Sequence, residues 1–506
     1  MSRLLSAVLL MSLASPALAQ TVDEKGAAEL SGNFARYIGK QAIERKLVAV
    51  VAKGDAYDVT IDVQALLGLL PEQKLLKSDF PPFTVKVKPR ADGNWDVSGA
   101  FPSRGAFEVK DENASRSTQF AIKDGKFEGV YDAGLASFLS AASSLAGASM
   151  TTRDKMQEAE MTTGAATATM NSTAAQGGGV DFSVSQKIAD FVEALKVDEP
   201  ESGFKFPLTV RSPELAVEAS GRGLRSKALL DLLAFGVANG EDAQVKANQA
   251  ELKALLLAAL PLWEHLDGSY GFKDLGVESP LGTFTASQFG VTVAADGISK
   301  NGAINYTIEA RGLNVPEVLV PAWSKPLVPT EVTLSFGGAN IDLDSMARKT
   351  IDTLDLDKEP PLPEGFGETL VADFLAETPK LVIRHSTIKS SDAEVAFEGE
   401  VTFPGEKPEI NTTIDIAGYD KIVETLQAAS KTMPEMAQYV PAALAVKGFA
   451  KSLPDGRLEW AVNGKPDGSV TVNGVMVKGV DPEPGDGTVT DEDESNDEDG
   501  AEATPQ

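Results

Sequence analysis

Hydrophobic and polar residues alternate along most of this chain with the period of a β-strand that buries one face. The clearest case lies between residues 409 and 430. Its first part places Ile410, Ile414 and Ile416 at alternate positions, between polar residues. After Gly418 the spacing of apolar residues changes to that of one face of a helix, with Tyr419, Ile422, Val423, Leu426 and Ala429. This stretch therefore predicts a half-buried strand that leads through a glycine directly into an amphipathic helix.

The same alternation predicts strands along most of the sequence. The principal segments are residues 57–63, 83–88, 95–99, 120–129, 180–184, 215–219, 284–293, 303–310, 331–336, 381–388, 395–403, 458–462 and 470–477. Two dipeptides, Asp124-Gly125 and Asn473-Gly474, are typical of the tight turn of a β-hairpin.

Helical spacing occurs in shorter segments between the strands. An N-terminal helix is expected over residues 26–37 and a strong helix over residues 248–263. Helix starts that follow strands are expected near Gln64, Ala133, Gln186, Ser226, Val315, Met346 and Tyr419. Because these starts have no fixed period, a regular solenoid is disfavoured. The predicted fold class is α+β: long curved antiparallel β-sheets with several short amphipathic helices packed on the apolar face or closing the ends.

Composition divides the chain into seven parts. Residues 147–179 are rich in Thr, Ala, Met, Gln and Gly, which indicates a low-complexity loop or linker. Residues 358–367 contain three prolines and indicate a second linker. The expected organisation is a signal peptide at 1–19, an N-terminal β-rich region with helices at 20–146, the loop or linker at 147–179, a middle α+β region at 180–357, the Pro-rich linker at 358–367, a C-terminal α+β module at 368–480 and an acidic tail at 481–506.

The first residues have the organisation of a secretory signal peptide. Arg3 precedes an apolar run over residues 4–13, and the small-residue site Ala17-Leu18-Ala19 follows. A membrane anchor is the alternative, but the run is much shorter than the ~20 residues that span a bilayer. The sequence therefore predicts export, with cleavage after Ala19.

Charge and cysteine content narrow the possible functions. The formal net charge is −28 at pH 7, which argues against binding nucleic acid or an anionic membrane surface, because both need basic patches. Without any cysteine, neither a disulfide nor a thiolate metal site can form. Residues 481–506 contain eleven acidic residues and no Lys or Arg, so we expect a disordered, solvating tail. Weak calcium binding by residues 491–494 is the alternative, although the EF-hand spacing is missing.

No motif indicates a catalytic, cofactor-binding or metal site. The chain has two histidines, His265 and His385, in unrelated segments without a second nitrogen ligand nearby, and each is expected to be a surface or strand residue. The sequence contains no Gly-x-Ser-x-Gly elbow, no His-Glu-x-x-His and no Walker loop. A site made of paired carboxylates stays open, because the 74 acidic residues allow many pairs. We therefore predict no catalytic residue, cofactor or metal ligand.

Three segments near the C-terminus carry a resemblance to a family. These are residues 414–419 (Ile-Asp-Ile-Ala-Gly-Tyr) with the helix after them, residues 453–459 (Leu-Pro-Asp-Gly-Arg-Leu-Glu), and the valine-rich residues 468–479. Together they resemble DUF2125, a family of exported bacterial proteins of unknown function, over a region of about 209–479. At the level of fold alone, the plan is similar to envelope proteins of the AsmA-like type, which are thought to shield lipid in an apolar groove. The resemblance implies a periplasmic protein and supplies no catalytic residue.

These observations favour a binding protein over an enzyme. The predicted strands outnumber the helices, so part of the apolar sheet surface is expected to stay uncovered, and uncovered apolar surface usually marks a binding site. We expect a non-enzymatic, periplasmic, envelope-associated protein without a transmembrane segment in its mature chain, whose partner is a lipid, another amphipathic ligand or an envelope protein. The alternative is a periplasmic hydrolase with a paired-carboxylate site that no motif reveals.

Overall fold

The computed structural model describes residues 21–69, 76–110, 115–199, 204–404 and 407–481. The predicted signal peptide at 1–19, and the predicted acidic tail beyond its first residue, Asp481, lie outside the described residues.

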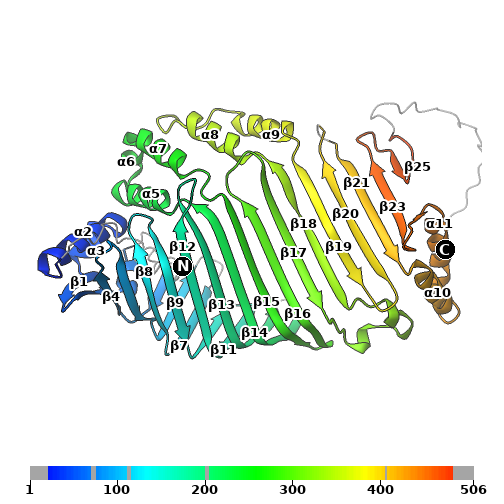
Figure 1. The fold of residues 1–506 in the computed structure, drawn as a ribbon, viewed down its shortest axis with the longest axis horizontal. Helices are drawn as coiled ribbons and strands as arrows, with labels where there is room; N and C mark the ends of the chain where they lie inside the picture. The colour runs from blue at the N-terminus through cyan, green and yellow to red at the C-terminus, as the bar shows by residue number, and fades with distance from the viewer. Residues whose placement is uncertain (1–20, 70–75, 111–114, 200–203, 405–406, 482–506) are drawn as a thin grey trace, which may run out of the picture.

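The described strands form one antiparallel sheet (Figure 1). In the first half they are β1 Val48–Lys53, β2 Ala56–Ile61, β3 Leu76–Asp79, β4 Phe83–Pro89, β5 Trp95–Ala100, β6 Arg104–Lys110, β7 Ser115–Lys123, β8 Lys126–Asp132, β9 Ser137–Leu145, β10 Gly147–Arg153, β11 Gln157–Thr163, β12 Ala166–Ala174 and β13 Val180–Glu199. In the second half they are β14 Phe204–Leu224, β15 His265–Ser279, β16 Gly282–Asp296, β17 Gly302–Arg311, β18 Glu331–Ile341, β19 Lys380–Lys389, β20 Glu394–Thr402, β21 Glu409–Ala417, β22 Lys451–Ser452, β23 Leu458–Gly464, β24 Val470–Val472 and β25 Val475–Lys478. From β13 to β21 each strand pairs with the next one along the chain, so the sheet is an up-and-down meander.

The helices lie at the ends of the strands and at the two ends of the sheet (Figure 1). They are α2 Glu24–Ile38, α3 Lys40–Glu44, α4 Val63–Leu67, α5 Ser226–Ala238, α6 Asp242–Ala247, α7 Gln249–Ala259, α8 Leu343–Thr353, α9 Phe366–Ala376, α10 Tyr419–Ser430 and α11 Tyr439–Gly448, with 3-10 turns η1 Glu317–Leu319, η2 Ala322–Leu327 and η3 Pro434–Gln438. Helices α2, α5, α7, α8 and α9 contact one another in that order and form a layer along one edge of the sheet. The predicted α+β class, a long curved antiparallel sheet with several helices, is confirmed.

The strands from β3 to β12 come in consecutive pairs (β3 with β4, β5 with β6, and so on to β11 with β12) that act as single bent strands. Strand β7 pairs with β6 and β10, whereas β8 pairs with β5 and β9. Backbone hydrogen bonds join the bends of neighbouring strands, as from Ala146 N to Lys123 O (2.8 Å) and from Gly164 N to Ala189 O (2.8 Å). We call this row of bends the bend line. The hairpin predicted at Asp124-Gly125 is therefore wrong, because β7 and β8 do not pair and the dipeptide forms a bend.

Aspartates in the left-handed region mark the bend line. Asp124, Asp190 and Asp274 have φ values of 51°, 50° and 46°. This region is costly for most side chains, but aspartate tolerates it because its short polar side chain bonds locally. At Asp190 the alternation of apolar residues along β13 shifts by one position, from Ile188 to Phe191. The sheet thereby bends without moving its apolar residues to the other face.

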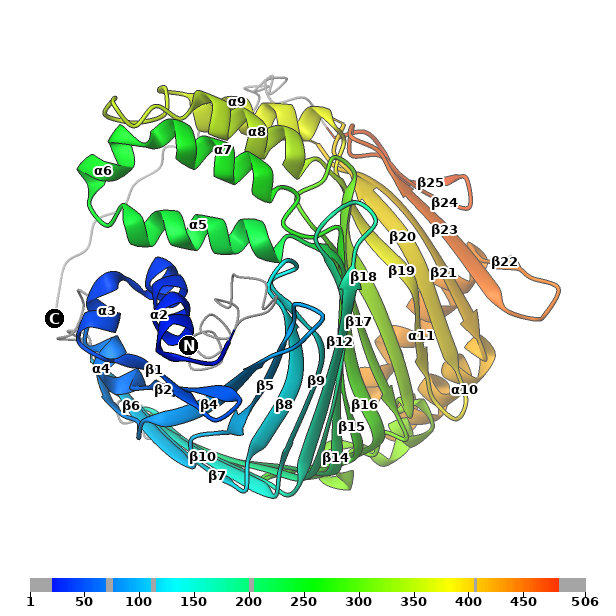
Figure 2. The ribbon, with the colours of Figure 1, turned by 60° about the vertical axis from the view of Figure 1, so that its left-hand side comes forward.

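One face of the sheet is apolar along its length; at the N-terminal end the sheet curls around α2 on this side, which we call the concave side (Figure 2). At the N-terminal end Leu30 and Phe34 of α2 pack on this face in a buried cluster with Tyr57, Val97 and Trp95. Figure 2 shows the sheet curling around α2 and α3. At the C-terminal end Tyr419 and Val423 of α10 pack with Trp460 of β23 on the same face.

The strand-to-helix joint at residues 409–430 is confirmed. Strand β21 ends at Ala417, Gly418 adopts a left-handed conformation with φ of 74°, and α10 begins at Tyr419. Only glycine adopts this conformation at little cost, and a Cβ there would lie 2.1 Å from the carbonyl oxygen of Asp392. The turn at Asn473-Gly474 between β24 and β25 is confirmed as well, with both residues at positive φ.

Four segments differ from the sequence-based expectations. The helix expected from Ala133 is strand β9, and the helix expected from Gln186 is part of β13, because both segments pair with strands on either side. The loop or linker expected at 147–179 forms β10, β11 and β12, since its Thr, Ala and Met residues alternate across the sheet. The helix expected near Val315 consists of the short turns η1 and η2, which prolines delimit.

The left-handed conformation of Asp190 gives a direct test of the bend line. Substitution Asp190→Val is expected to lower the free energy of unfolding by about 1–2 kcal/mol, because a β-branched residue is strained at positive φ. Asp190→Gly is expected to leave it unchanged or to raise it. Chemical denaturation measures both, and Lys187→Val in the regular part of β13 is the control. Equal stabilities of Asp190→Val and Lys187→Val would contradict this account of the bend.

Candidate functional site

The apolar side of the sheet continues far beyond the helices that cover its two ends. We define the apolar face by residues of β13 to β21 that neighbour one another across the ladder and point to the concave side. They include Val184, Ile188, Val217, Leu215, Tyr270, Phe272, Val291, Phe289, Tyr306, Ile308, Phe336, Leu334, Ile383, Leu381, Phe397, Val401, Ile414 and Ile410.

Several large side chains of this apolar face are unusually exposed. Tyr270, Tyr306, Phe336, Leu381 and Ile410 expose 44, 38, 46, 55 and 38% of their surface. They come from five strands between β15 and β21, and all lie on the same face. A single exposed apolar residue needs no explanation, but a row of them on one face is typical of a binding surface.

Aromatic rings run across the apolar face in two rows. Phe191, Phe272 and Phe289 come from β13, β15 and β16, with ring centroids 5.5 and 6.4 Å apart. Tyr306 and Phe336, on the neighbouring strands β17 and β18, are stacked with centroids 6.0 Å apart. The contact between Phe191 and Phe272 also shows that the apolar face is continuous across the bend line.

The described helices leave the middle of the apolar face uncovered. The buried hydrophobic clusters lie under α2 at one end and under α10 at the other, with a small one between α2 and α5. Within the described ranges, no helix makes extensive contact with β15 to β20; α5, α7, α8 and α9 contact one another along the strand ends instead. The same part of the chain holds no helix long and apolar enough to cross a membrane.

The opposite face of the sheet is polar. Short side chains on adjacent strands bond to one another, as Thr307 Oγ1 does with Ser335 Oγ (2.9 Å) and Arg384 Nε with Asn305 Oδ1 (2.8 Å). Shallow cavities on this face are lined mainly by Ser, Thr, Asn and Asp. The two faces thus differ sharply in chemistry, as expected for a sheet that binds an apolar partner on one side and meets water on the other.

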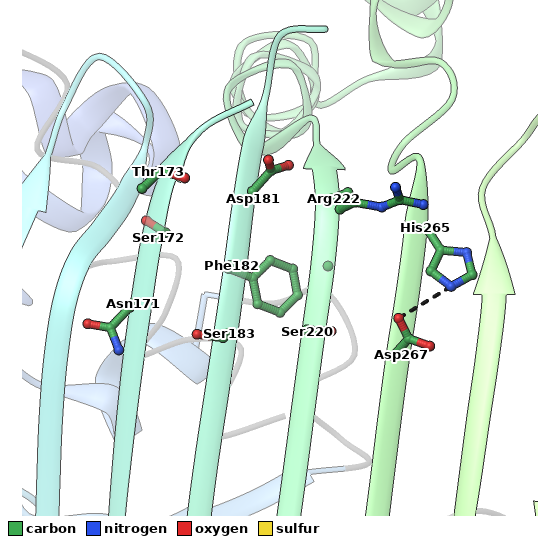
Figure 3. A pocket seen from close by; sticks show the side chains of 11 residues that line it. Asn171, Ser172, Thr173, Asp181, Phe182, Ser183, Ser220, Arg222, His265 and Asp267 are labelled. Atoms are coloured by element: carbon green, nitrogen blue, oxygen red, sulfur yellow. Dashed lines mark ion pairs between the residues drawn. The ribbon is translucent and has the colours of Figure 1, made fainter. Parts of the chain in front are cut away.

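His265 lies at a polar rim of the sheet between two carboxylates. Its Nδ1 is 2.6 Å from Asp296 Oδ1, and its Nε2 is 3.3 Å from Asp267 Oδ2. Figure 3 shows the ion pair between His265 and Asp267, with Arg222 on the neighbouring strand β14. Asp296 is itself oriented by the backbone N–H of Ala303, which donates to its Oδ2 (2.9 Å). The hydrogen bond to Asp296 raises the pKa of His265 above its ordinary value of 6.5.

The second histidine lies in a different part of the sheet. His385 belongs to β19, where its Nδ1 is 3.6 Å from Glu398 Oε2 and its side chain is 67% exposed. The structure therefore does not bring the two histidines together, and each is a strand residue. Among the described residues, no group of three or more His, Cys, Asp or Glu is arranged to hold a metal ion.

One pair of carboxylates on the polar face is relevant to the hydrolase alternative. Asp415 of β21 lies opposite Glu459 of β23 in the ladder, and its Oδ1 is buried without a hydrogen-bond partner. Burial, and then the negative charge of Glu459, raise the pKa of Asp415. A cavity on the same face is lined by other residues, among them Glu398, Glu400 and Thr413, and Asp415 does not line it.

Sequence reasoning found the apolar positions but not which of them are exposed. Tyr306 and Phe336 alternate with polar residues as buried residues do, and nothing in their spacing shows that they are exposed. The sequence indicated exposed apolar surface only through its overall content of elements, because a chain with many half-buried strands and few helices cannot cover all of its apolar surface.

Comparison of the sequence with protein-family models found no match, and comparisons with curated proteins and with solved structures found no similar chain. The resemblance to DUF2125 stays a prediction.

The environment of His265 predicts a pH-dependent contribution to stability. Because its pKa is higher in the folded protein than in the unfolded chain, the interaction stabilises the fold fully below pH 6.5 and is lost as the pH rises through the raised pKa. His265→Gln is therefore expected to destabilise the protein more at pH 6 than at pH 8.5, as chemical denaturation at the two pH values measures. In an Asp296→Asn background this difference should largely disappear. A cost of His265→Gln that is the same at both pH values would contradict the interpretation.

Proposed function

We propose that the apolar face binds the hydrocarbon chains of lipids and shields them from water. The observation that carries the proposal is the row of exposed large apolar residues on the concave side, which the described helices leave uncovered. Removing apolar surface from water is favourable by roughly 25 cal/mol per Å². Hydrocarbon chains that lie against this row are therefore bound without specific polar contacts.

The dimensions of the exposed row suit lipid chains. It extends from Tyr270 in β15 to Ile410 in β21. At about 4.8 Å between neighbouring strands, six intervals correspond to about 29 Å. The hydrocarbon core of a bilayer, which two opposed acyl chains fill, has a similar thickness of ~30 Å.

The same proposal places the protein in the bacterial periplasm as an envelope-associated, non-enzymatic protein. The charged start, short apolar run and small-residue site at 1–19 support export, and the resemblance to DUF2125 supports a bacterial envelope location. A lipid-binding surface is useful in that compartment, where lipid chains must cross water between two membranes.

A periplasmic hydrolase is the second candidate, and the half-buried Asp415 carboxylate beside Glu459 favours it. A raised carboxyl pKa beside a second acid suits a general acid. Lipid binding is supported better, because the exposed apolar row involves five strands, whereas the carboxylate pair does not line the cavity on the same face.

Charge introduced into the apolar face tests the proposal. The purified protein is expected to bind phosphatidylcholine with a pyrene-labelled acyl chain, measured by fluorescence titration. Phe336→Glu is expected to weaken binding at least about tenfold. The acyl chain of the lipid would then lie against the new carboxylate, which would have to give up its hydrating water. The matched control is Thr387→Glu, on the neighbouring strand β19 but on the polar face, which is expected to bind as the wild type does.

Two outcomes contradict the proposal. One is equal affinity of the wild type and Phe336→Glu for the labelled lipid. The other is a protein that binds no lipid but reproducibly hydrolyses an ester, glycoside or phosphate and loses that activity in Asp415→Asn, which would favour the hydrolase.

A further inference from the structure

A second candidate binding site lies outside the sheet, in the layer of helices. An open cavity of about 1130 Å³ lies between α2 and α3, α5 and α7. Ligand cavities usually measure a few hundred to about a thousand Å³, so this one is large enough for an organic molecule. It does not belong to the apolar face.

Each helix contributes one side to this cavity. On α2 the lining residues Gly32, Ala35 and Arg36 follow helical spacing, and Gly39 directly follows the helix. Leu30 and Phe34, which pack on the sheet, lie on the opposite side of the same helix. The cavity and the apolar face are therefore separated by α2, and a ligand in one does not touch the other.

The walls of the cavity combine small and apolar side chains. Ala35, Ala234 and Ala238 leave space between the helices, since each carries only a methyl group. Phe235, Val237 and Leu255 add apolar surface. Such walls accept the hydrocarbon or aromatic body of a ligand.

The lining of the cavity has one more cation than it has carboxylates, in a protein whose net charge is −28. Arg36, Lys40 and Lys227 line it, against two carboxylates, Asp231 and Glu251. Asp231 is shared by two of the cations, at 2.8 Å from Arg36 Nη2 and 3.6 Å from Lys227 Nζ. Lys40 forms no ion pair within the part of the chain that the structure describes, so its ammonium group is available to a ligand.

We propose that this cavity binds an amphiphile with a single anionic head group, a carboxylate, sulfonate or phosphate, attached to an apolar body. Lys40 and Lys227 attract the anionic head, and Phe235, Val237 and Leu255 pack on the body. Because the cations lie at the same cavity as the apolar wall, a neutral molecule with the same body gains only the apolar part of the interaction.

A pair of fluorescent probes that differ only in charge tests the proposal. 8-Anilinonaphthalene-1-sulfonate carries a sulfonate on the ring system that N-phenyl-1-naphthylamine has without it. The double variant Lys40→Gln/Lys227→Gln is expected to bind the sulfonate about tenfold more weakly than the wild type and the neutral probe equally well. Both lysines are exposed, so the variant is expected to fold, as circular dichroism checks.

Two further variants separate this site from the apolar face. Lys246→Gln, in the neighbouring helix α6 and outside the cavity lining, removes one charge and is expected to bind the sulfonate as the wild type does. Phe336→Glu is expected to weaken binding of the neutral probe and to leave sulfonate binding unchanged. If the double variant keeps wild-type affinity for the sulfonate, or if Phe336→Glu abolishes binding of both probes, the cavity is not an anion site and the proposal is wrong.

Discussion

A pleated strand directs successive side chains to opposite faces, and the architecture of this protein depends on that constraint. Strand after strand, its sequence places apolar residues at alternate positions, so their side chains meet on one face of a single long sheet. A sheet packed against a second sheet buries such a face, but here the described strands belong to a single hydrogen-bonded sheet. The concave side is therefore apolar and open, which follows from the alternation itself.

The helices close this surface only where it ends. Leu30 and Phe34 of α2 bury the face over the first strands, and Tyr419 with Val423 of α10 buries it beside Trp460. The sheet bends along the bend line. Aspartates with positive φ, such as Asp190, allow this bend while the apolar residues stay on one face. Helices α5, α7, α8 and α9 form a layer along the strand ends, and a cavity lies between α2, α3, α5 and α7. The fold thus separates an open apolar surface from a cavity that contains both cations and apolar side chains.

Local sequence predicted the elements wherever one pattern dominated. The joint at Gly418 was predictable because a strand period, a glycine and a helical period follow one another within 22 residues. Residues 133–145 were predicted to be helical because their Ala and Ser residues permit a helix. Pairing with β8 and β12 makes β9 in this segment a strand, and the local sequence does not show that pairing. The prediction of a hairpin at Asp124-Gly125 failed for a related reason. A dipeptide that suits the turn of a hairpin also suits a bend within a long strand, where Asp124 has a positive φ. The exposure of Phe336 depends on which helices cover the sheet, so no local pattern contained it.

Photo-crosslinking tests the central claim most directly, because it reports what touches the apolar face while the protein is in the cell. A p-benzoylphenylalanine residue replaces Phe336 on the concave side or, in a second variant, Thr333 on the polar side of the same strand, β18. After irradiation of living bacteria, mass spectrometry of the purified protein is expected to find lipid adducts at position 336 and none at position 333. Equal labelling at both positions, or no lipid adduct at position 336, would contradict the account.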